Sequence, residues 1–535
     1  MKKLPVGLQN FQEIISSNFL YVDKTKQLYD VINEGKLYFL ARPRRFGKSL
    51  LISTFQHLFT GKKDLFKDLY IGKETTYDWQ VYPVLQFSFA SMGHQVTNLV
   101  ERLSRELQRI ADDFQVEIGT YSVTEQFRNL IERIAQRGEP VVILIDEYDK
   151  PIVDFLTQVT QARINQKILK DFFSPLKELE LKGYIRFLFI TGVSKFSKVS
   201  LFSDLNNLTD LSNLSIAHDL TGITQQELLQ YFPDYIRKAK LAFEMSEEEL
   251  LSGVQLWYDG YSFEGNTRLY NPFSLLNFFR SLTFNNFWFA TGTPTFLVES
   301  IRDNKIRPAE LEQVEVAATF FDKFSLKDLD IIGLLFQTGY LTIKKVTRKR
   351  YKQTYFLGYP NIEVRQSFIH NLLEAFSYQP TSIVGNALLK IEQGLTNGNI
   401  ELFIEQLKIL LSDLSYFHTP RKKKSPTRKD EDKAFAMWEG YFHTIIYLIT
   451  AFIGLEVHSE ITKHKGRLDL LAETDDFLYL MEFKLEKPAK DAIAQIKNRD
   501  YISTYRNTHK KLILVGIGFS ASERNVQSWE WEIWK

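Results

Sequence analysis

Short apolar runs alternate with amphipathic stretches through the first third of the chain. Runs of strand length are Lys36–Ala41, Val84–Phe89, Pro140–Ile145 and Tyr184–Ile190. Between them, Ser49–Phe59 and Val96–Ile110 repeat apolar residues at helical spacing. Unbroken apolar runs are typical of strands that are covered on both faces, so the alternation predicts a parallel α/β sheet.

Later parts of the chain follow other patterns. Residues 220–415 are rich in Phe and Leu and predict a mostly helical region, whereas 420–430 hold two prolines and six basic residues, typical of an exposed linker. Lys433–Ile453 and Ala489–Tyr505 have helical patterns, and the strand-like runs around them are Leu455–Ile461, Arg467–Ala472, Phe477–Leu485 and Lys511–Ile517. We therefore expect four segments: an α/β domain (1–215), a helical middle region (216–418), a basic linker (419–432) and a small α/β domain (433–535).

Composition refines this picture in three ways. The 535 residues carry a net charge of +2 and are 44% hydrophobic, which is ordinary globular usage. The absence of cysteine from the sequence excludes a disulfide scaffold, a cysteine nucleophile and a thiolate zinc site. The most apolar stretch, 441–455, is shorter than the roughly 20 residues that span a bilayer. We expect a cytoplasmic protein that does not enter a membrane; the oligomeric state stays open.

A phosphate-binding signature lies between the first predicted strand and helix. Arg42–Ser49 reads RPRRFGKS, which ends in the Gly-Lys-Ser of a P-loop. Gly47 lets the backbone approach a phosphate, Lys48 reaches the β- and γ-phosphates, and the Ser49 hydroxyl binds Mg²⁺. The helix that begins there directs its amides and dipole at the anion.

One position departs from this pattern, because Arg42 replaces the first glycine. The three arginines of the loop (Arg42, Arg44 and Arg45) are candidate contacts to phosphate or carboxylate. The alternative is a solvated basic turn.

A second element follows the third strand. Val141–Ile145 runs directly into Asp146 and Glu147, an arrangement in which Asp146 supports Mg²⁺ and Glu147 polarises the attacking water. The next apolar run ends at Thr191, whose hydroxyl can sense the γ-phosphate from a neighbouring strand end. The alternative is a charged strand end at the surface, and the order of both elements argues against it.

These motifs together resemble the AAA-ATPase-like family of bacterial proteins. The residues that carry the resemblance are Tyr21–Thr25, Arg42–Ser49, Ile145–Pro151, Thr191–Phe196, Trp257–Phe263, Tyr270–Leu275 and Phe287–Pro294. The resemblance implies an α/β P-loop NTPase core with a parallel sheet, a helical middle region and a small C-terminal PD-(D/E)XK nuclease-like α/β domain. It implies ATP as the nucleotide, bound by Arg44, Arg45, Phe46, Gly47, Lys48, Ser49, Leu50, Asp146 and Thr191. The aromatic motifs of the middle region either pack around fixed turns or contact nucleotide.

A second set of chemical groups lies near the C-terminus. Arg467–Ala472 and Phe477–Leu485 form a predicted hairpin, and side chains two apart share a face, so Glu482 and Lys484 point the same way. With a turn at 473–476, Asp469 lies opposite about Leu480, one diagonal step from Glu482. Two carboxylates suit Mg²⁺, with Mn²⁺ as a possible substitute, and Lys484 can orient a metal-bound water.

This set resembles the PD-(D/E)XK nuclease core. The resemblance implies catalytic roles for Asp469, Glu482, Lys484 and Gln495, and places Glu439 near the metal with Asp469 and Glu482. Tyr501 matches a further motif position, while Leu468 stands where that pattern often has proline. The alternative is an exposed ion pair on an amphipathic strand, but Glu482 and Lys484 interrupt an apolar run, where unpaired charge is costly.

Two functions follow from these patterns. The first is an Mg²⁺-dependent ATPase coupled to a nuclease that acts on nucleic acid, more readily DNA than RNA. The second is a nucleotide-switched module that binds nucleic acid without cleaving it. The basic residues of 421–429 either hold a phosphate backbone or form a solvated hinge.

Overall fold

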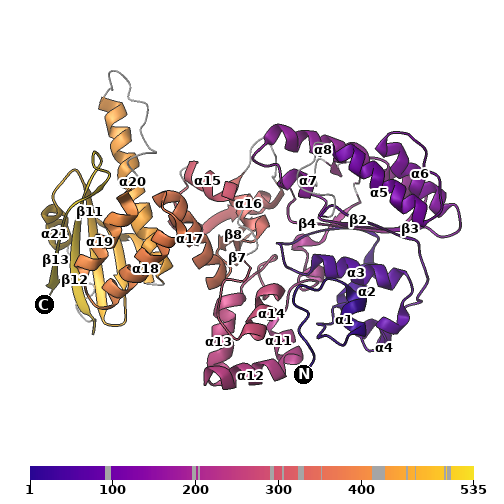
Figure 1. The fold of residues 1–535 in the computed structure, drawn as a ribbon, viewed down its shortest axis with the longest axis horizontal. Coiled ribbons are helices and arrows are strands. Elements are labelled where there is room, and N and C mark those ends of the chain that lie inside the picture. Colours follow the sequence, from indigo (N-terminus) through magenta and orange to yellow (C-terminus); the bar gives the residue numbers. More distant parts are fainter. Residues whose placement is uncertain are drawn as a thin grey trace. The chain divides into compact units, whose positions relative to one another are not determined.

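The computed structural model describes the chain except residues 91–97, 196–200, 203–204, 206, 289–294, 304–305, 323–329, 351, 413–427, 454–455, 464–465, 499–501, 503–507 and 535. The chain divides into two units (Figure 1). Unit 1 comprises Met1–Phe296 and Gln313–Arg365, and unit 2 comprises Leu297–Glu312 and Gln366–Lys535. The expected middle segment, 216–418, is thus shared between both units.

Unit 1 is built on a parallel sheet with the strand order β2-β3-β4-β1-β5. Its strands are β1 (Leu37–Ala41), β2 (Val84–Ser88), β3 (Val141–Asp146), β4 (Ile185–Gly192) and β5 (Thr209–Asp210). Every residue of β1 and β3 is buried, as the unbroken apolar runs predict. Strand β4 lies between β1 and β3, so the chain segments that follow these three strands meet at one edge of the sheet.

Helices cover both faces of this sheet (Figure 1). One face carries α1 (Phe11–Ser16), α2 (Thr25–Glu34), α3 (Lys48–Phe59) and α4 (Tyr70–Lys73). The other face carries α5 (Leu99–Asp113), α6 (Val123–Ala135), α7 (Lys150–Val153) and α8 (Val159–Phe173). A further helix, α9 (Leu176–Leu181), precedes β4. Phe55 of α3 packs on Phe189 of β4 with ring centroids 4.8 Å apart. This aromatic contact fixes the axis of α3 against the sheet.

The rest of unit 1 holds a helical cluster and a second sheet. Helices α11 (Gln225–Tyr231), α12 (Pro233–Phe243), α13 (Glu247–Tyr258) and α14 (Pro272–Ser281) enclose a common apolar core. Strands β6 (Val314–Ala317), β7 (Thr342–Lys349) and β8 (Lys352–Gly358) pair antiparallel in the order β6-β8-β7, next to α16 (Ile331–Thr338) in sequence. The sequence patterns predict helix here and miss this sheet, because its strands are largely polar.

Unit 2 packs helices on a mixed sheet. The sheet order is β13-β12-β11-β10-β9, with β11 and β12 parallel and the other pairs antiparallel. Its strands are β9 (Glu456–Lys463), β10 (Gly466–Glu473), β11 (Phe477–Leu485), β12 (Lys511–Ser520) and β13 (Asn525–Trp534). Its helices are α18 (Thr381–Thr396), α19 (Ile400–Leu411), α20 (Arg428–Phe452) and α21 (Ala489–Asn498), and α15 (Thr295–Asp303) and α17 (Ile362–Ser377) run from one unit into the other.

Two sequence expectations bear on the segment before this sheet. Helix α20 begins at Arg428, five residues earlier than the predicted start at Lys433, so the end of the expected linker is helical. The rest of that linker falls within 413–427, outside the described residues.

Among the helices that the structure describes, none combines the length and the apolar character needed to cross a bilayer.

Candidate functional sites

The loop between β1 and α3 turns through two residues with left-handed backbone conformations. Arg45 has a φ of 66° and Gly47, which caps α3, has a φ of 88°. Gly47 adopts this φ without strain because it lacks a Cβ. Helix α3 then begins at Lys48. Its first amides and the positive end of its dipole therefore lie at the carboxyl end of β1, an arrangement that binds anions.

Lys48 lies inside this loop. Its ammonium donates hydrogen bonds to the carbonyl oxygens of Arg42 (3.0 Å) and Pro43 (2.9 Å). Burial lowers the pKa of Lys48, and the negative charges of Glu147 and Asp146 act in the opposite direction. The structure thus brings the lysine of the loop close to Asp146, the last residue of β3, and to Glu147, which follows it.

Arg42, the residue at the position of the first P-loop glycine, points away from the loop. Its guanidinium donates hydrogen bonds to the carbonyl oxygens of Ser212 (2.7 Å) and Ala217 (3.0 Å) and lies 4.0 Å from the ring centre of Phe263. The side chain is 1% exposed, and burial lowers its pKa to about 9. The expectation that Arg42 contacts phosphate is therefore wrong: its hydrogen bonds tie the loop to two distant chain segments.

The remaining loop residues differ in what they can offer a ligand. Arg44 and Arg45 are exposed, and Ser49 and Leu50 are half-buried. The side chain of Phe46 is fully buried. Phe46 lines the apolar pocket beside the loop, and the other four present accessible side chains.

The ends of β3 and β4 are joined by a short hydrogen bond. The Thr191 hydroxyl donates to Asp146 Oδ1 (2.6 Å), and the Glu147 amide donates to the same hydroxyl (3.4 Å). Asp146 is buried, while Glu147 is partly exposed and has a left-handed φ of 53°. The hydroxyl of Thr191 thus fixes the orientation of one acidic side chain and the backbone of the next.

Sequence reasoning missed Asp149 as a further member of this site. Its buried carboxylate accepts hydrogen bonds from the amides of Val193 (3.1 Å) and Ser194 (2.6 Å) and from the Ser194 hydroxyl (2.7 Å). Burial raises the pKa of Asp149, and these hydrogen bonds oppose the rise. The signal was present in the sequence, since both partners belong to motifs of the family resemblance, but only the fold brings them together.

An apolar pocket of about 650 Å³, including its open mouth, adjoins the loop. Gly47, Leu50 and Thr54 form one side of it, and its other walls come from the N-terminal segment and from residues 220–223, 232, 272 and 276. Thr221 lines this pocket, and its buried hydroxyl has no hydrogen-bond partner among the described residues. An apolar pocket with one unsatisfied polar group suits a flat, weakly polar ligand group.

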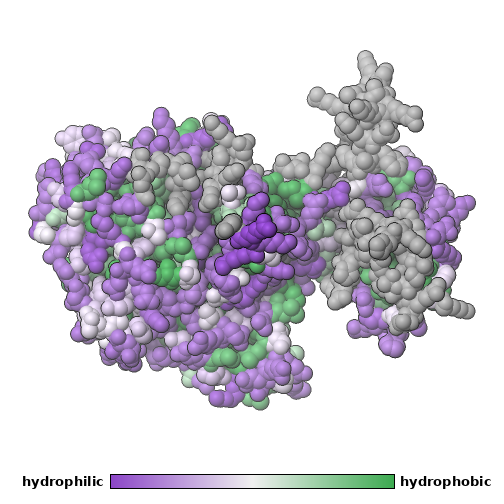
Figure 2. All heavy atoms as spheres, turned by 180° about the vertical axis from the view of Figure 1, so that it is seen from behind, coloured by the Kyte–Doolittle hydropathy of each residue, from purple (hydrophilic) through white to green (hydrophobic). Residues whose placement is uncertain are grey.

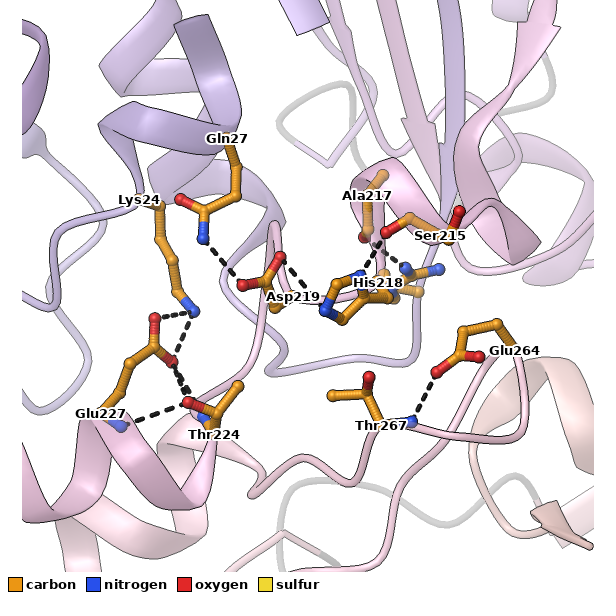
Figure 3. Close-up of polar contacts among 11 residues, drawn as sticks. Lys24, Gln27, Ser215, Ala217, His218, Asp219, Thr224, Glu227, Glu264 and Thr267 are labelled. Carbon is orange, nitrogen blue, oxygen red and sulfur yellow. Dashed lines mark hydrogen bonds and ion pairs between the residues drawn. The ribbon is translucent and has the colours of Figure 1, made fainter. Parts of the chain in front are cut away.

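Ionic and polar contacts hold two walls of this pocket together (Figure 3). The ammonium of Lys24 lies 2.6 Å from Glu227 Oε1, and Glu227 also accepts the amide of Thr224 (2.8 Å), which caps α11. Nearby, Gln27 donates to Asp219 (2.7 Å). These bonds connect the N-terminal segment to the chain that follows the sheet, which gives the pocket a fixed width.

In unit 2, Asp469 and Glu482 lie directly across from each other. The antiparallel pairing of β10 with β11 includes Leu470 opposite Met481, and Asp469 and Glu482 occupy the next position. Directly opposed residues share a face of the sheet, and Lys484, two residues beyond Glu482, shares it as well. The structure therefore gathers the two carboxylates and the ammonium on one face.

This register corrects the predicted one. The turn was expected at 473–476, which placed Asp469 opposite about Leu480. The turn instead closes one residue later, with the Thr474 amide donating to the Phe477 carbonyl (2.9 Å). The pairing shifts by two residues, which preserves the face of Asp469 and replaces a diagonal relation to Glu482 with a direct one.

Glu482 is the most constrained member of the cluster. Oε1 accepts hydrogen bonds from Lys484 (3.1 Å) and from the side-chain amide of Gln495 on α21. The residue is 1% exposed, and burial, then the charge of Asp469, raise its pKa to about 7. Oε2 is buried and has no partner among the described residues. A buried carboxylate oxygen without a donor fits a cation ligand.

Asp469 is held by the neighbouring strand and lies near a histidine. The Phe483 amide donates to Asp469 Oδ2 (2.8 Å), and His443 Nε2 of α20 lies 3.9 Å from the same oxygen. Over the described residues, no group of three or more His, Cys, Asp or Glu side chains has metal-binding geometry. A pair of carboxylates suits Mg²⁺, which retains waters and takes further oxygens from a phosphate substrate.

Comparison with known proteins finds a family match for each of the two parts of the chain that hold these sites. Residues 5–202 match the family described as "Predicted AAA-ATPase", and residues 437–529 match the PD-(D/E)XK nuclease superfamily. A protein of Azotobacter chroococcum mcd 1, described as "Uncharacterized protein in vnfD 5'region", is 34% identical over 534 residues, which cover 98% of each chain. The chain belongs to the AAA-ATPase-like family. No solved structure matches the chain significantly.

The two matches place the sites of this AAA-ATPase-like protein in separate domains. The first match contains the loop after β1 and the ends of β3 and β4, and the second contains the Asp469–Glu482 pair with Lys484 and Gln495. The predicted family and fold class are thereby confirmed. The matches indicate an ATPase-type domain and a nuclease-type domain. Domains of these two kinds generally use ATP and divalent metals, respectively.

Other candidates of the nuclease-like domain stand apart or fall outside the described chain. Glu439 is exposed on α20, and no contact links it to Asp469 or Glu482 among the described residues. Tyr501 and the basic residues of 421–427 lie outside the described residues. Of the six residues assigned to this site by resemblance, the structure thus brings four together: Asp469, Glu482, Lys484 and Gln495.

Proposed function

We propose that this AAA-ATPase-like protein binds and hydrolyses ATP in unit 1 and cleaves phosphodiester bonds of nucleic acid in unit 2, with Mg²⁺ at both sites and Mn²⁺ as a substitute at the second. The observation that carries the proposal is the direct opposition of Asp469 and Glu482 beside Lys484, in a chain that also holds a phosphate-binding loop.

The proposed roles in unit 1 follow from position. The amides at the start of α3 and the ammonium of Lys48 hold the β- and γ-phosphates. Ser49 and Asp146 supply oxygens for Mg²⁺, and Glu147 accepts a proton from the attacking water. Thr191 keeps Asp146 in orientation through its 2.6 Å hydrogen bond. Arg44 and Arg45, both exposed on the loop, add positive charge beside the phosphates.

The apolar pocket next to Gly47 is the proposed place of the adenine ring. It adjoins the loop through Leu50, and its walls are held by the Lys24–Glu227 ion pair. The unsatisfied hydroxyl of Thr221 is a hydrogen-bond partner for a ring nitrogen. The pocket therefore supports a nucleotide, rather than a simple phosphate, as the ligand.

The proposed roles in unit 2 follow from burial and charge. Mg²⁺, when bound, supplies a water of lowered pKa and neutralises the scissile phosphate. Asp469 and the Oε2 atom of Glu482 hold the metal, and this oxygen fits the task because it is buried without a hydrogen-bond donor. Lys484 orients the water, and Gln495 fixes the carboxylate of Glu482 through its amide.

Cleavage of a labelled DNA duplex in Mg²⁺ tests the nuclease half. We expect cleavage by the wild type and by Glu523→Gln, an exposed acid of the same unit, and a loss of at least about 100-fold in Glu482→Gln. Binding of DNA without cleavage in Mg²⁺, Mn²⁺ or Ca²⁺ contradicts a nuclease and favours a nucleotide-switched binding module.

Coupling between the two sites is the further part of the proposal, and it rests on their presence in one chain. We expect the cleavage rate to differ between nucleotide-free protein and protein with a non-hydrolysable ATP analogue. The matched control is Lys48→Ala, which removes the response to the analogue but retains cleavage. Equal rates with and without the analogue in the wild type contradict coupling.

A further inference from the structure

The β7–β8 hairpin of unit 1 is densely cationic. Six basic residues lie within the nine positions 344–352, and all six are exposed: Lys344, Lys345, Arg348, Lys349, Arg350 and Lys352. In Figure 2 the hairpin lies within the strongly hydrophilic patch near the centre of the face shown. No sequence motif points to this segment, and the whole chain has a net charge of only +2. The charge is therefore a local feature of this hairpin.

Four of these cations lie at the tip of the hairpin. Among the described residues, no carboxylate forms an ion pair with Arg348, Lys349, Arg350 or Lys352. Lys349 and Lys352 are paired directly across the two strands, and like charges in that relation destabilise a hairpin. Arg350 adds a left-handed φ of 52° at the turn. Folding alone gives no reason for this arrangement, whereas a bound polyanion compensates it.

One face of the hairpin alternates cations with hydroxyl groups. Lys345, Thr347 and Lys349 of β7 share a face because they are two residues apart, and Lys352 and Thr354 of β8 lie opposite the last two of them. Lysine ammonium and threonine hydroxyl groups are both donors that contact phosphate oxygens in complexes with DNA. The row of donors fits a chain of phosphates better than a single anion.

The hairpin is firmly anchored at its base. Arg268 donates hydrogen bonds to the carbonyl oxygens of Ile343 (3.1 Å) and Lys344 (2.6 Å). The hydroxyl of Thr342 accepts the amide of Ser262 (2.7 Å) and donates to its carbonyl oxygen (2.9 Å). The cations therefore project from a fixed two-stranded ribbon, whose backbone needs little ordering on binding.

The anchor of the hairpin also contacts the phosphate-binding loop. Ser262 lies between Tyr261 and Phe263, and both rings pack edge-on against Phe46, with centroids 4.9 Å and 5.5 Å away. Phe263 also covers the guanidinium of Arg42 at 4.0 Å. The hairpin thus belongs to unit 1, which also carries the phosphate-binding loop, and its anchor packs against that loop.

We infer that the β7–β8 hairpin binds the phosphate backbone of duplex DNA. The inference rests on the proposed action on nucleic acid and assigns it a binding element in unit 1. A two-stranded ribbon fits the major groove of B-form DNA, whereas the deep and narrow major groove of duplex RNA excludes it. An anionic membrane is a poorer match, because the described tip positions are cations rather than apolar side chains that enter lipid.

The test compares two quadruple variants of the full-length protein. The hairpin variant is Arg348→Ala/Lys349→Ala/Arg350→Ala/Lys352→Ala, and the control is Lys62→Ala/Lys63→Ala/Lys67→Ala/Lys73→Ala, four exposed lysines elsewhere in unit 1. Fluorescence anisotropy measures binding to a labelled duplex over a salt series in EDTA, which prevents metal-dependent cleavage. Circular dichroism confirms that both variants are folded.

The expected result is a loss of at least about 100-fold in DNA affinity for the hairpin variant, with the slope of log K against log salt reduced by about three to four. The control keeps the wild-type slope to within about one, and Arg348→Lys/Arg350→Lys retains it as well. An unchanged affinity and slope in the hairpin variant overturn the inference, and so does equal binding of duplex RNA.

The outcome is separable from that of the proposed function. Wild-type cleavage together with unaltered DNA binding by the hairpin variant overturns the hairpin assignment and leaves the nuclease intact. A hairpin variant that loses binding to vesicles containing an anionic lipid, but binds DNA like the wild type, also overturns the assignment. DNA binding that depends on the hairpin, without cleavage in any divalent metal, supports the hairpin and contradicts the nuclease.

Discussion

Asp469 faces Glu482 across β10 and β11, one position beyond the pair formed by Leu470 and Met481. This opposition places two carboxylates side by side in a largely apolar sheet, and the resulting burial and repulsion raise the pKa of Glu482 to about 7. Lys484 contacts Glu482 and His443 lies near Asp469, and this buried pair of carboxylates fits the metal site that we propose.

The hydroxyl of Thr191 is the first target for mutation. Thr191→Val keeps the size of the side chain but removes the donor to Asp146 Oδ1. Because this hydrogen bond is made to a charged group, its loss is expected to lower kcat for ATP hydrolysis by about 10- to 100-fold, with ATP affinity little changed. Steady-state ATPase kinetics measure both quantities. Thr209→Val, on the exposed edge strand β5, is the control, and equal effects of the two variants contradict the assigned role.

Arg42 gives a prediction that separates this loop from the common P-loop pattern. Arg42→Gly restores the consensus glycine but leaves the carbonyl oxygens of Ser212 and Ala217 without their donor. We expect the unfolding free energy of unit 1 to fall by about 3 kcal/mol. Calorimetry of Arg42→Gly beside Arg44→Gly, whose side chain is exposed, provides the comparison. A variant as stable as the wild type refutes a structural role for Arg42.

The pocket beside Gly47 is tested by filling it. Leu276 lines the pocket, and Leu276→Trp narrows the space proposed for adenine. ATP affinity is expected to fall at least about tenfold, while the affinity for inorganic tripolyphosphate stays within about threefold of the wild type. Leu229→Trp, at an exposed position of α11, is the matched control in calorimetric titrations. Equal losses for both ligands argue against a nucleobase in the pocket.

Glu363 predicts a pH dependence of stability. Its buried carboxylate accepts the amide of Trp288 (2.7 Å), and burial raises its pKa from 4.5 to about 7. The folded state therefore binds the proton more tightly than the unfolded state, so this contribution is full below pH 4.5, declines up to pH 7 and is absent above. Glu363→Gln removes this decline, and its unfolding free energy rises relative to wild type across that interval. Parallel stability curves for the two proteins, measured by denaturant titration, are incompatible with this account.

The strands of the first sheet were predictable because the sheet is covered on both faces. The run Pro140–Ile145 identifies β3 (Val141–Asp146) to within one residue at each end, since only a doubly buried strand is apolar throughout. Burial on both faces also makes the register of a strand hard to predict. Strand β11 is buried on both faces, so no alternation of polar and apolar residues indicates how it aligns with β10. The position of the turn sets this alignment, and the predicted pairing was wrong by two positions.

Long-range contacts account for the rest of what the sequence concealed. Arg42 binds carbonyl oxygens 170 and 175 residues away, which no local pattern records. The β7–β8 hairpin escaped prediction because its cations mask the alternation of a strand. Part of the candidate site of unit 2 was predictable, since Asp469, Glu482, Lys484 and Gln495 come together, whereas Glu439 does not join them.

The most direct test of the whole account is metal-dependent cleavage by Lys484→Ala. The wild type and Lys490→Ala, an exposed lysine on α21, are expected to cleave duplex DNA in Mg²⁺. Lys484→Ala is expected to bind the duplex with wild-type affinity and to cleave it at least about 100-fold more slowly. Cleavage by Lys484→Ala at the wild-type rate, or no cleavage by the wild type in any divalent metal, contradicts the proposed nuclease.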